Sequence, residues 1–311
     1  MTFALRGLGL VLAALLCARP ALGDEDVSLT AQLRALAAAH QGKVALFAVD
    51  LRSGRTAAID ADTPVPTESV IKLAVLFEAL EQIRGGRAHF EDTVTLRKSD
   101  KVEGSGVLTF FDTPQTLTLK DALTMMIVVS DNTGANLAID RLGLKNIDRR
   151  LIWLGLANTW LYKKVFLPPV PPVPADQKQF GLGKTTAREM ARLMQRFVDC
   201  NLNAPGEPLN SSAQDRKLCD AAVDMLKNQT DQDAIPRYLQ SLVAPGKELV
   251  VANKTGADDA VRNDVAVVYA RGGPIVISEF TYDNKDQSWT PDNAALILMA
   301  ALARTIVEHW Q

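Results

Sequence analysis

The spacing of apolar residues predicts short strands at both ends of the chain and helices between them. Val44–Leu51 alternates and is rich in β-branched residues, which is typical of a strand. Further strands are expected near the C-terminus, at Glu248–Ala252, Asp264–Ala270 and Ile275–Tyr282. A final helix with an apolar stripe is expected from about Asn293 to Trp310. Strands from both ends of the chain indicate one sheet, with a helical part inserted between them.

Helical patterns fill the middle of the chain. Ser69–Ile83 is apolar on nearly every side, which predicts a helix buried in the core, and Gly85-Gly86 ends it. Thr186 and Glu189 have the spacing of a capping box, which opens a helix that runs to about Cys200. Further helices are expected at Leu119–Val129, Gly134–Leu142 and Asp220–Asn228.

These elements predict a mixed α/β fold of the α+β type, with an antiparallel sheet flanked by helices and an all-helical lobe. We expect residues 24–61 and 216–311 to form the α/β lobe, and residues 62–215 to form the helical lobe. The helical lobe includes a Pro-rich loop at 161–185 without periodicity, and a loop of this length in a compact domain usually has a function. The functional site is expected between the lobes.

The N-terminus has the pattern of an export signal. Arg6 precedes the apolar run Leu8–Cys17, and Ala21-Leu22-Gly23 supplies the small residues that a signal peptidase prefers. This pattern predicts a signal peptide over residues 1–23 and a periplasmic or secreted mature protein. The apolar run is too short to span a bilayer comfortably, and no later stretch is long and apolar enough to cross a membrane, so we expect no stable membrane insertion of the mature chain.

Charge and composition exclude some partners and leave the cysteines open. A net charge of -2 gives no general attraction to nucleic acid. The histidines are scattered without metal-ligand spacing, and neither a metal nor a cofactor is expected. Cys200 and Cys219 bracket a polar connection, and in an oxidising compartment they form either a disulfide or two unpaired buried thiols.

The first segment that carries chemistry is Ser69-Val70-Ile71-Lys72. The three-residue step places a hydroxyl and an amine on one side of a helix, close enough for a hydrogen bond. A serine needs an adjacent base to become a nucleophile, and a lysine can be that base if burial or a second cation lowers its pKa. Ser69 is therefore the candidate nucleophile, although such a spacing also arises by chance on solvated helices.

Two later motifs suit the same chemistry. Ser130 can pass a proton to a departing nitrogen and Asn132 can hold a substrate carbonyl, although both residue types also favour helix N-caps. Lys254 supplies a second cation, Thr255 offers a hydroxyl to a substrate carboxylate, and Gly256 lets a substrate approach a strand edge. Each motif alone is weak, but their order along the chain is specific.

Together the three motifs resemble those of the class A β-lactamases and penicillin-binding proteins. The resemblance implies that Ser69 is acylated, that Lys72 is the base or relay, and that Ser130 protonates the leaving nitrogen. It implies an oxyanion hole formed by the backbone N–H groups of Ser69 and Ala257. Asn132 would bind the substrate amide, and the expected carboxylate-binding residues are Lys254, Thr255 and Arg262.

The chain departs from class A β-lactamases in the loop that follows Ser130-Asp131-Asn132. Those enzymes carry a glutamate there that activates the deacylating water, whereas no glutamate occurs here between Glu103 and Glu189. Glu189 is assigned to the capping box, and Asp176, the loop's only acid, has a shorter reach and lies beyond the prolines.

The sequence therefore predicts a β-lactamase-like serine hydrolase that forms a seryl acyl-enzyme with β-lactams and deacylates poorly. The alternative enzyme is a penicillin-binding D,D-peptidase that acts on the acyl-D-Ala-D-Ala end of a peptidoglycan stem peptide. A third alternative, from another class, is a β-lactam sensor that is acylated once without turnover. Intact mass after mixing with a penicillin separates these alternatives.

Overall fold

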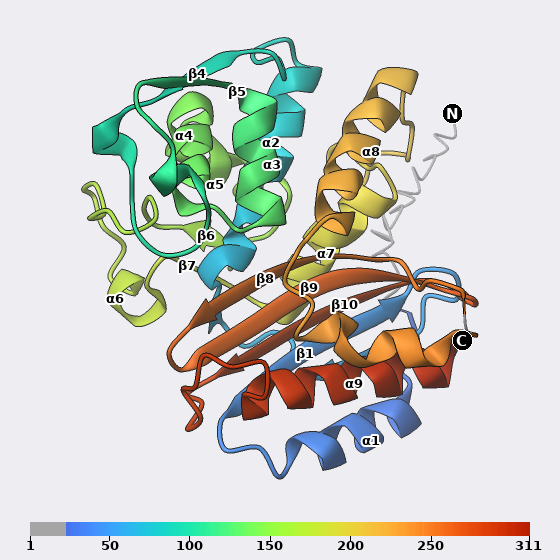
Figure 1. The fold of residues 1–311 in the computed structure, drawn as a ribbon. Coiled ribbons are helices and arrows are strands. Elements are labelled where there is room, and N and C mark those ends of the chain that lie inside the picture. Colours follow the sequence, from blue (N-terminus) through green and yellow to red (C-terminus); the bar gives the residue numbers. More distant parts are fainter. Residues whose placement is uncertain (1–22, 245) are drawn as a thin grey trace, which may run out of the picture.

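The computed structural model describes residues 23–244 and 246–311, so all but the last residue of the predicted signal peptide lies outside the described ranges. An antiparallel sheet with strand order β2-β1-β10-β9-β8 forms the centre, with helices on both of its faces (Figure 1). This arrangement confirms the predicted fold class. The strands of this sheet are β1 (Lys43–Asp50), β2 (Thr56–Ile59), β8 (Val251–Asp258), β9 (Val261–Ala270) and β10 (Gly273–Tyr282).

The sheet joins the two ends of the chain. β1 pairs antiparallel with β10, from Lys43 opposite Tyr282 to Asp50 opposite Ile275. On the other side of β10, β9 and then β8 continue the ladder toward the helical part of the molecule (Figure 1). β8 is therefore the edge strand nearest the inserted helices.

One face of the sheet is covered by α1 (Val27–Ala37), α9 (Ala294–Trp310) and the 3₁₀ segment η4 (Ile235–Leu242). Figure 1 shows α1 and α9 side by side below the strands. Leu29 of α1 and Ile306 of α9 belong to the same apolar cluster as Ile277 of β10, and all three are fully buried. The burial of these apolar side chains stabilises the packing of α1 and α9 against the sheet.

The other face carries the helical part, built around α2 (Lys72–Arg84). Lys72–Ile83 is buried along its whole length, in agreement with the expected core helix. In the described ranges, no helix combines the length and hydropathy needed to cross a membrane. The remaining helices are α3 (Leu119–Val128), α4 (Asn132–Leu142), α5 (Leu144–Trp153), α6 (Gln177–Phe180), α7 (Ala187–Val198) and α8 (Ala213–Lys227).

Short elements hold the loops around α2. A three-stranded sheet of β3 (Val65–Pro66), β7 (Gly183–Thr185) and β6 (Trp160–Leu161) ties both ends of the loop 161–185 to the segment before α2. β4 (Thr93–Leu96) and β5 (Gln115–Thr118) form a hairpin on the far side of the helical part (Figure 1). The other short elements are the 3₁₀ segments η1 (Glu68–Ile71), η2 (Lys98–Asp100) and η3 (Leu108–Phe110).

Several boundaries differ from the sequence expectation. β8 continues through Lys254 to Asp258 because it pairs with β9 along its full length, whereas the apolar pattern indicated a strand ending at Ala252. α8 begins at Ala213, where Ser212 and Asp215 form a capping box. Thr186 caps α7, but the Glu189 carboxylate accepts hydrogen bonds from Asn158 and Thr159 instead of closing a capping box.

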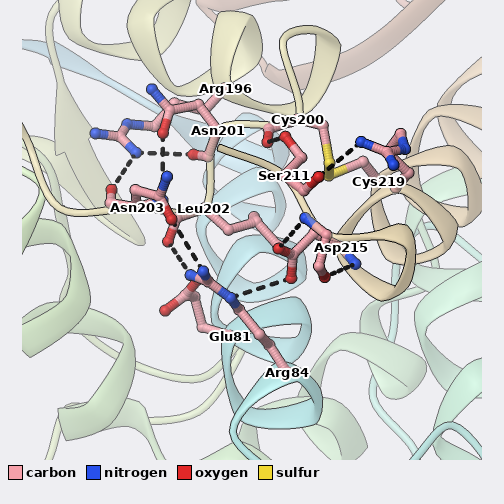
Figure 2. The surroundings of a disulfide bond; sticks show 12 residues. Glu81, Arg84, Arg196, Cys200, Asn201, Leu202, Asn203, Ser211, Asp215 and Cys219 are labelled. Carbon is pink, nitrogen blue, oxygen red and sulfur yellow. Dashed lines mark hydrogen bonds and ion pairs between the residues drawn. A yellow bond between two sulfur atoms is a disulfide. The ribbon is translucent and has the colours of Figure 1, made fainter. Parts of the chain in front are cut away.

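The structure joins Cys200 and Cys219 in a disulfide, with their Cα atoms 5.5 Å apart. The bond connects the end of α7 to α8 (Figure 2). Figure 2 also shows Arg84 of α2 reaching the same region, where it donates to Asn203 Oδ1 at 2.9 Å and lies 3.1 Å from Asp215 Oδ1. The connection between α7 and α8 is therefore attached covalently to α8 and by polar contacts to the core helix.

Candidate active site

Ser69 lies in η1, immediately before α2. The two apolar residues that follow it, Val70 and Ile71, are buried in the main core and fix the start of the helix. β8 runs directly against this segment, because a Cβ added at Gly256 would lie 2.9 Å from Ser69 N and 2.8 Å from Thr67 O. Gly256 therefore lies directly against the backbone of Ser69, the candidate nucleophile.

Lys72 is the first residue of α2 and is only 1% exposed. Its ammonium donates to Ser130 O at 2.6 Å, to Ser130 Oγ at 3.2 Å and to Asn132 Oδ1 at 2.8 Å. These acceptors satisfy the three donors of an ammonium group. Within the described residues no hydrogen bond joins Lys72 to Ser69 Oγ, in contrast to the bond expected from their spacing, because the amine is drawn to Ser130 and Asn132.

Lys254 approaches Ser130 from the opposite side. Its Nζ donates to Ser130 Oγ at 3.0 Å and to Thr255 O at 2.7 Å, and its side chain is fully buried. The hydroxyl of Ser130 therefore accepts hydrogen bonds from two lysines, which leaves its own proton free to be donated elsewhere. Ser130 has a φ of 54°, a backbone strain of the kind found where a functional group must be held in place.

The electrostatics of this group favour a neutral amine at Lys72. Burial lowers the pKa of Lys72 well below its usual value, and the positive charge of Lys254 lowers this pKa further. Burial also lowers the pKa of Lys254, to about 8, although the charges of Asp231 and Asp264 oppose that shift. Near neutral pH, Lys254 is thus mostly cationic, whereas Lys72 releases its proton far more readily than an exposed lysine.

Asp131 and Asn132 have different structural roles, the first as a helix cap and the second in contacts with a neighbouring loop. Asp131 is the N-cap of α4 and also accepts hydrogen bonds from the backbone N–H groups of Val107 and Leu108. Asn132 N donates to Ser105 O, and Asn132 Nδ2 donates to Glu103 O at 3.0 Å. The N-cap therefore positions Ser130 and Asn132, and the loop around Glu103 lies over the Asn132 amide.

The strand β8 borders a cavity of about 170 Å³ next to this cluster. Thr255, Gly256 and Ala257 line it from the strand. Arg262 also lines it, but its guanidinium donates to the carbonyls of Val261 and Ser288 and stacks on Trp289, with 4.5 Å from Cζ to the ring centroid. Arg262, the candidate second cation, thus lies at the cavity, but much of its guanidinium group is already engaged in hydrogen bonds to backbone carbonyls.

The loop 161–185 is held against α4 by Asn136, which lies one helical turn after Asn132. Asn136 Oδ1 accepts from Val165 N at 2.8 Å, and Asn136 Nδ2 donates to Val165 O at 3.0 Å. Asp176 lies 2.5 Å from Lys184 in an ion pair that lowers the Asp176 pKa. Asp176 is therefore committed to the loop's own structure, which does not favour it as a substitute base.

Some residues at the site escaped the sequence analysis. Glu68 precedes Ser69, has a φ of 42°, and has a pKa raised to about 7 by burial and by the charge of Asp258. Asn136 binds the backbone of Val165, 29 positions away, and the ring of Phe166 lies next to Gly104. Glu68 could have been noted from its adjacency to the nucleophile, whereas nothing in the local pattern marks the other two residues.

The chain is similar in sequence to curated β-lactamases. Beta-lactamase 1 of Streptomyces cacaoi is 26% identical over 87% of this chain and 81% of its own length. Beta-lactamase SME-1 of Serratia marcescens is 24% identical over 87% of this chain and 88% of its own.

Two solved structures share the fold closely. A β-lactamase from Sphaerobacter thermophilus DSM 20745 superposes with a TM-score of 0.75 and 25% identity, covering 90% of this chain and 96% of that one. The structure of PBP-A superposes with a TM-score of 0.74 at 22% identity, covering 92% and 96%. The model of the Beta-lactamase enzyme family matches residues 28–310. With the fold and the motifs, this match shows that the chain belongs to the β-lactamase enzyme family of hydrolases.

Proposed function

We propose that this protein is acylated by β-lactams at Ser69 and releases the acyl group slowly. The observation that carries this proposal is the Ser130 hydroxyl, which lies within hydrogen-bond distance of both Lys72 and Lys254. A proton relay between a base and a leaving group requires such a shared hydroxyl. The absence of a glutamate from the loop 161–185 supports the slow second step.

The hydrogen bonds of Ser130 support a route for acylation. Neutral Lys72 accepts the Ser69 proton as Ser69 Oγ attacks the carbonyl carbon. As the carbon–nitrogen bond breaks, Ser130 gives its proton to the nitrogen and takes the proton held by Lys72, which leaves Lys72 neutral again. The backbone N–H groups of Ser69 and Ala257 bind the developing oxyanion, which stabilises the transition state by about 3–4 kcal/mol for each donor.

The substrate is oriented by groups on both sides of Ser69. Lys254 and Thr255 bind the carboxylate of the β-lactam from β8, while Asn132 binds the amide of its acyl side chain. Cationic Lys254 suits this role because its pKa of about 8 keeps most of it protonated at neutral pH. Arg262 contributes its charge to the same side of the cavity.

Deacylation requires a base that activates water on the ester. Asp176 is paired with Lys184, and the Glu189 carboxylate is occupied by Asn158 and Thr159. Neither acid is therefore available for the water, and the acyl-enzyme is expected to persist. A D,D-peptidase that acts on acyl-D-Ala-D-Ala peptides is the alternative that this loop favours.

Intact-mass analysis after mixing with benzylpenicillin tests the proposal. We expect an adduct of one penicillin that persists, and we expect Ser69→Ala to abolish it. Rapid return to the free mass with consumption of the drug would indicate an efficient β-lactamase. Turnover of a D-Ala-D-Ala peptide would indicate the peptidase, and a lasting adduct without peptide turnover would indicate a sensor. No adduct with any β-lactam would reject the whole proposal.

We further propose that the protein is exported and acts in the periplasm or outside the cell. The N-terminal pattern of Arg6 and the apolar run Leu8–Cys17 supports export, and the Cys200–Cys219 disulfide is typical of an oxidising compartment. N-terminal sequencing of protein from cell fractions tests this. A chain that keeps Met1 and remains in the cytosol would contradict it.

A further inference from the structure

Phe166 combines exposure with backbone strain at the edge of the candidate site. Its side chain is 55% exposed and its φ is 57°, a left-handed conformation that costs a residue with a Cβ about 1–2 kcal/mol. Burial of the ring does not compensate this cost, since more than half of the side chain faces solvent.

The strain is imposed by the neighbouring residue. Asn136 binds both the N–H and the carbonyl of Val165, and all atoms of these two bonds are buried. Val165 is itself packed in the main core. With the preceding peptide unit fixed in this way, the chain turns outward at Phe166 and presents its ring at the surface. Non-glycine residues held in such conformations cluster at ligand-binding and catalytic sites.

The ring lies beside the amide that binds substrate in the proposed mechanism. A Cβ added at Gly104 would lie 2.9 Å from Phe166 Cε2 and 2.7 Å from Asn132 Nδ2. The aromatic ring and the Asn132 amide therefore lie side by side next to Gly104, because both are within 3 Å of the same point. A substrate amide bound at Asn132 would project its acyl substituent along this boundary, toward the exposed ring.

We propose that Phe166 is a specificity-determining residue that contacts the acyl side chain of the substrate and favours aromatic or large apolar acyl groups. The inference rests on the proposed acylation of Ser69 and on substrate binding at Asn132. Contact with the substrate would bury a ring that the free protein leaves in water, and paired aromatic rings add attraction beyond the buried area.

The test compares two penicillins that differ only in the acyl side chain. Benzylpenicillin carries a phenylacetyl group, whereas 6-aminopenicillanic acid has a bare amine at the same position. We expect Phe166→Ala to lower the second-order acylation rate with benzylpenicillin about tenfold, an aromatic contact of ordinary strength, and to leave the rate with 6-aminopenicillanic acid unchanged. The matched control is Phe110→Ala, which removes a phenylalanine that is 82% exposed and should alter neither rate.

Other outcomes reject the inference. An equal loss with both penicillins would mean that Phe166 only shapes the loop, and no loss with either would mean that the substrate does not touch the ring. If Phe166→Ala fails to fold, Phe166→Leu removes the aromatic ring but retains an apolar side chain, and a smaller drop in the ratio of the two rates is required. Wild-type protein that neither penicillin acylates would instead reject the proposed function.

Discussion

The site depends on backbone segments that approach each other where a side chain would not fit. Gly256 is the clearest case, because its Cα faces the backbone of Thr67, Ser69 and Val70. β8 and η1 can lie this close only if the strand carries no Cβ at that point. The N–H groups of Ser69 and Ala257, which are expected to form the oxyanion hole, are brought to the same place by this contact.

We predict that Gly256→Ala lowers the acylation rate about 100-fold with the fold retained. The new Cβ would lie within 2.9 Å of backbone nitrogens and would push the strand away from Ser69. The measurement is the second-order rate of adduct formation, with the melting temperature as a check on folding. Gly206→Ala is the control, because a Cβ there meets nothing within 4 Å; its φ of 86° makes an alanine less stable, so a lower melting temperature with full activity is expected. An active Gly256→Ala would contradict the proposed geometry.

Val165 offers a way to supply the missing deacylation base. Its backbone is bound by Asn136, one helical turn from Asn132, which brings this part of the loop beside α4, and we expect a glutamate that replaces the buried valine to reach the ester at Ser69. We predict that Val165→Glu shortens the lifetime of the acyl-enzyme by about 100-fold, the range expected for a general base. Time-resolved intact mass measures the lifetime, and Val165→Gln, which cannot accept the proton, should leave it long.

At the residue scale, the sequence marks the candidate reacting groups better than it marks their surroundings. Ser69, Lys72, Ser130 and Lys254 are predictable because each combines a reactive side chain with a fixed motif, and the structure brings Ser130 within reach of both lysines. The hydrogen bonds between Asn136 and Val165 are not predictable, because they join residues 29 positions apart. No local pattern reports such a contact.

At the scale of elements, the sequence predicts the existence of most helices and strands but misplaces several ends. β8 is the informative case, because Asn253 and Lys254 are polar and so break the apolar pattern of a strand. These residues are buried all the same, since Asn253 binds Asp264 and Lys254 binds Ser130. In sequence, polar residues that face a buried site look like the start of a loop. In the structure, the pairing of β8 with β9 continues through them.

The connection between α7 and α8 is held by the disulfide. We predict that a Cys200→Ser/Cys219→Ser double variant loses about 2–4 kcal/mol of unfolding free energy, because the bond closes a loop of 19 residues and restricts the unfolded chain. Urea unfolding measures the loss. The acylation rate should stay unchanged, since neither cysteine contacts the catalytic cluster. Equal stability of the variant and the wild type would contradict a structural role for the bond.

For the whole molecule, the sheet contains a buried carboxyl group that makes stability depend on pH. Glu279 on β10 is fully buried opposite Asp264 of β9, and both of its carboxylate oxygens lack a hydrogen-bond partner among the described residues. Burial raises the pKa of Glu279 well above its usual value, and the Asp264 charge raises it further. The folded protein therefore retains a proton on Glu279 that the unfolded chain releases above a pH of about 4.5.

Because the folded state binds the extra proton, the stability contribution of Glu279 is present at low pH and declines as pH rises above 4.5. The decline amounts to about 1.4 kcal/mol for each pH unit until the folded pKa is reached. We predict that Glu279→Gln removes this slope and becomes increasingly more stable than wild type as pH rises from 5 toward the folded-state pKa of Glu279. Urea unfolding across this range measures the difference. Glu308→Gln at the surface is the control, and parallel curves for all three proteins would contradict the prediction.

The pairing of β1 with β10 has a consequence for how the protein is made. The reacting groups are spread over three distant parts of the chain, and the strand that carries Lys254 reaches the first strand only through β9 and β10. β10 follows all three motifs along the chain, so it leaves the ribosome or a translocation channel after them. We therefore expect the candidate nucleophile of the nascent chain to stay inert until β10 has emerged and the strands have closed the sheet.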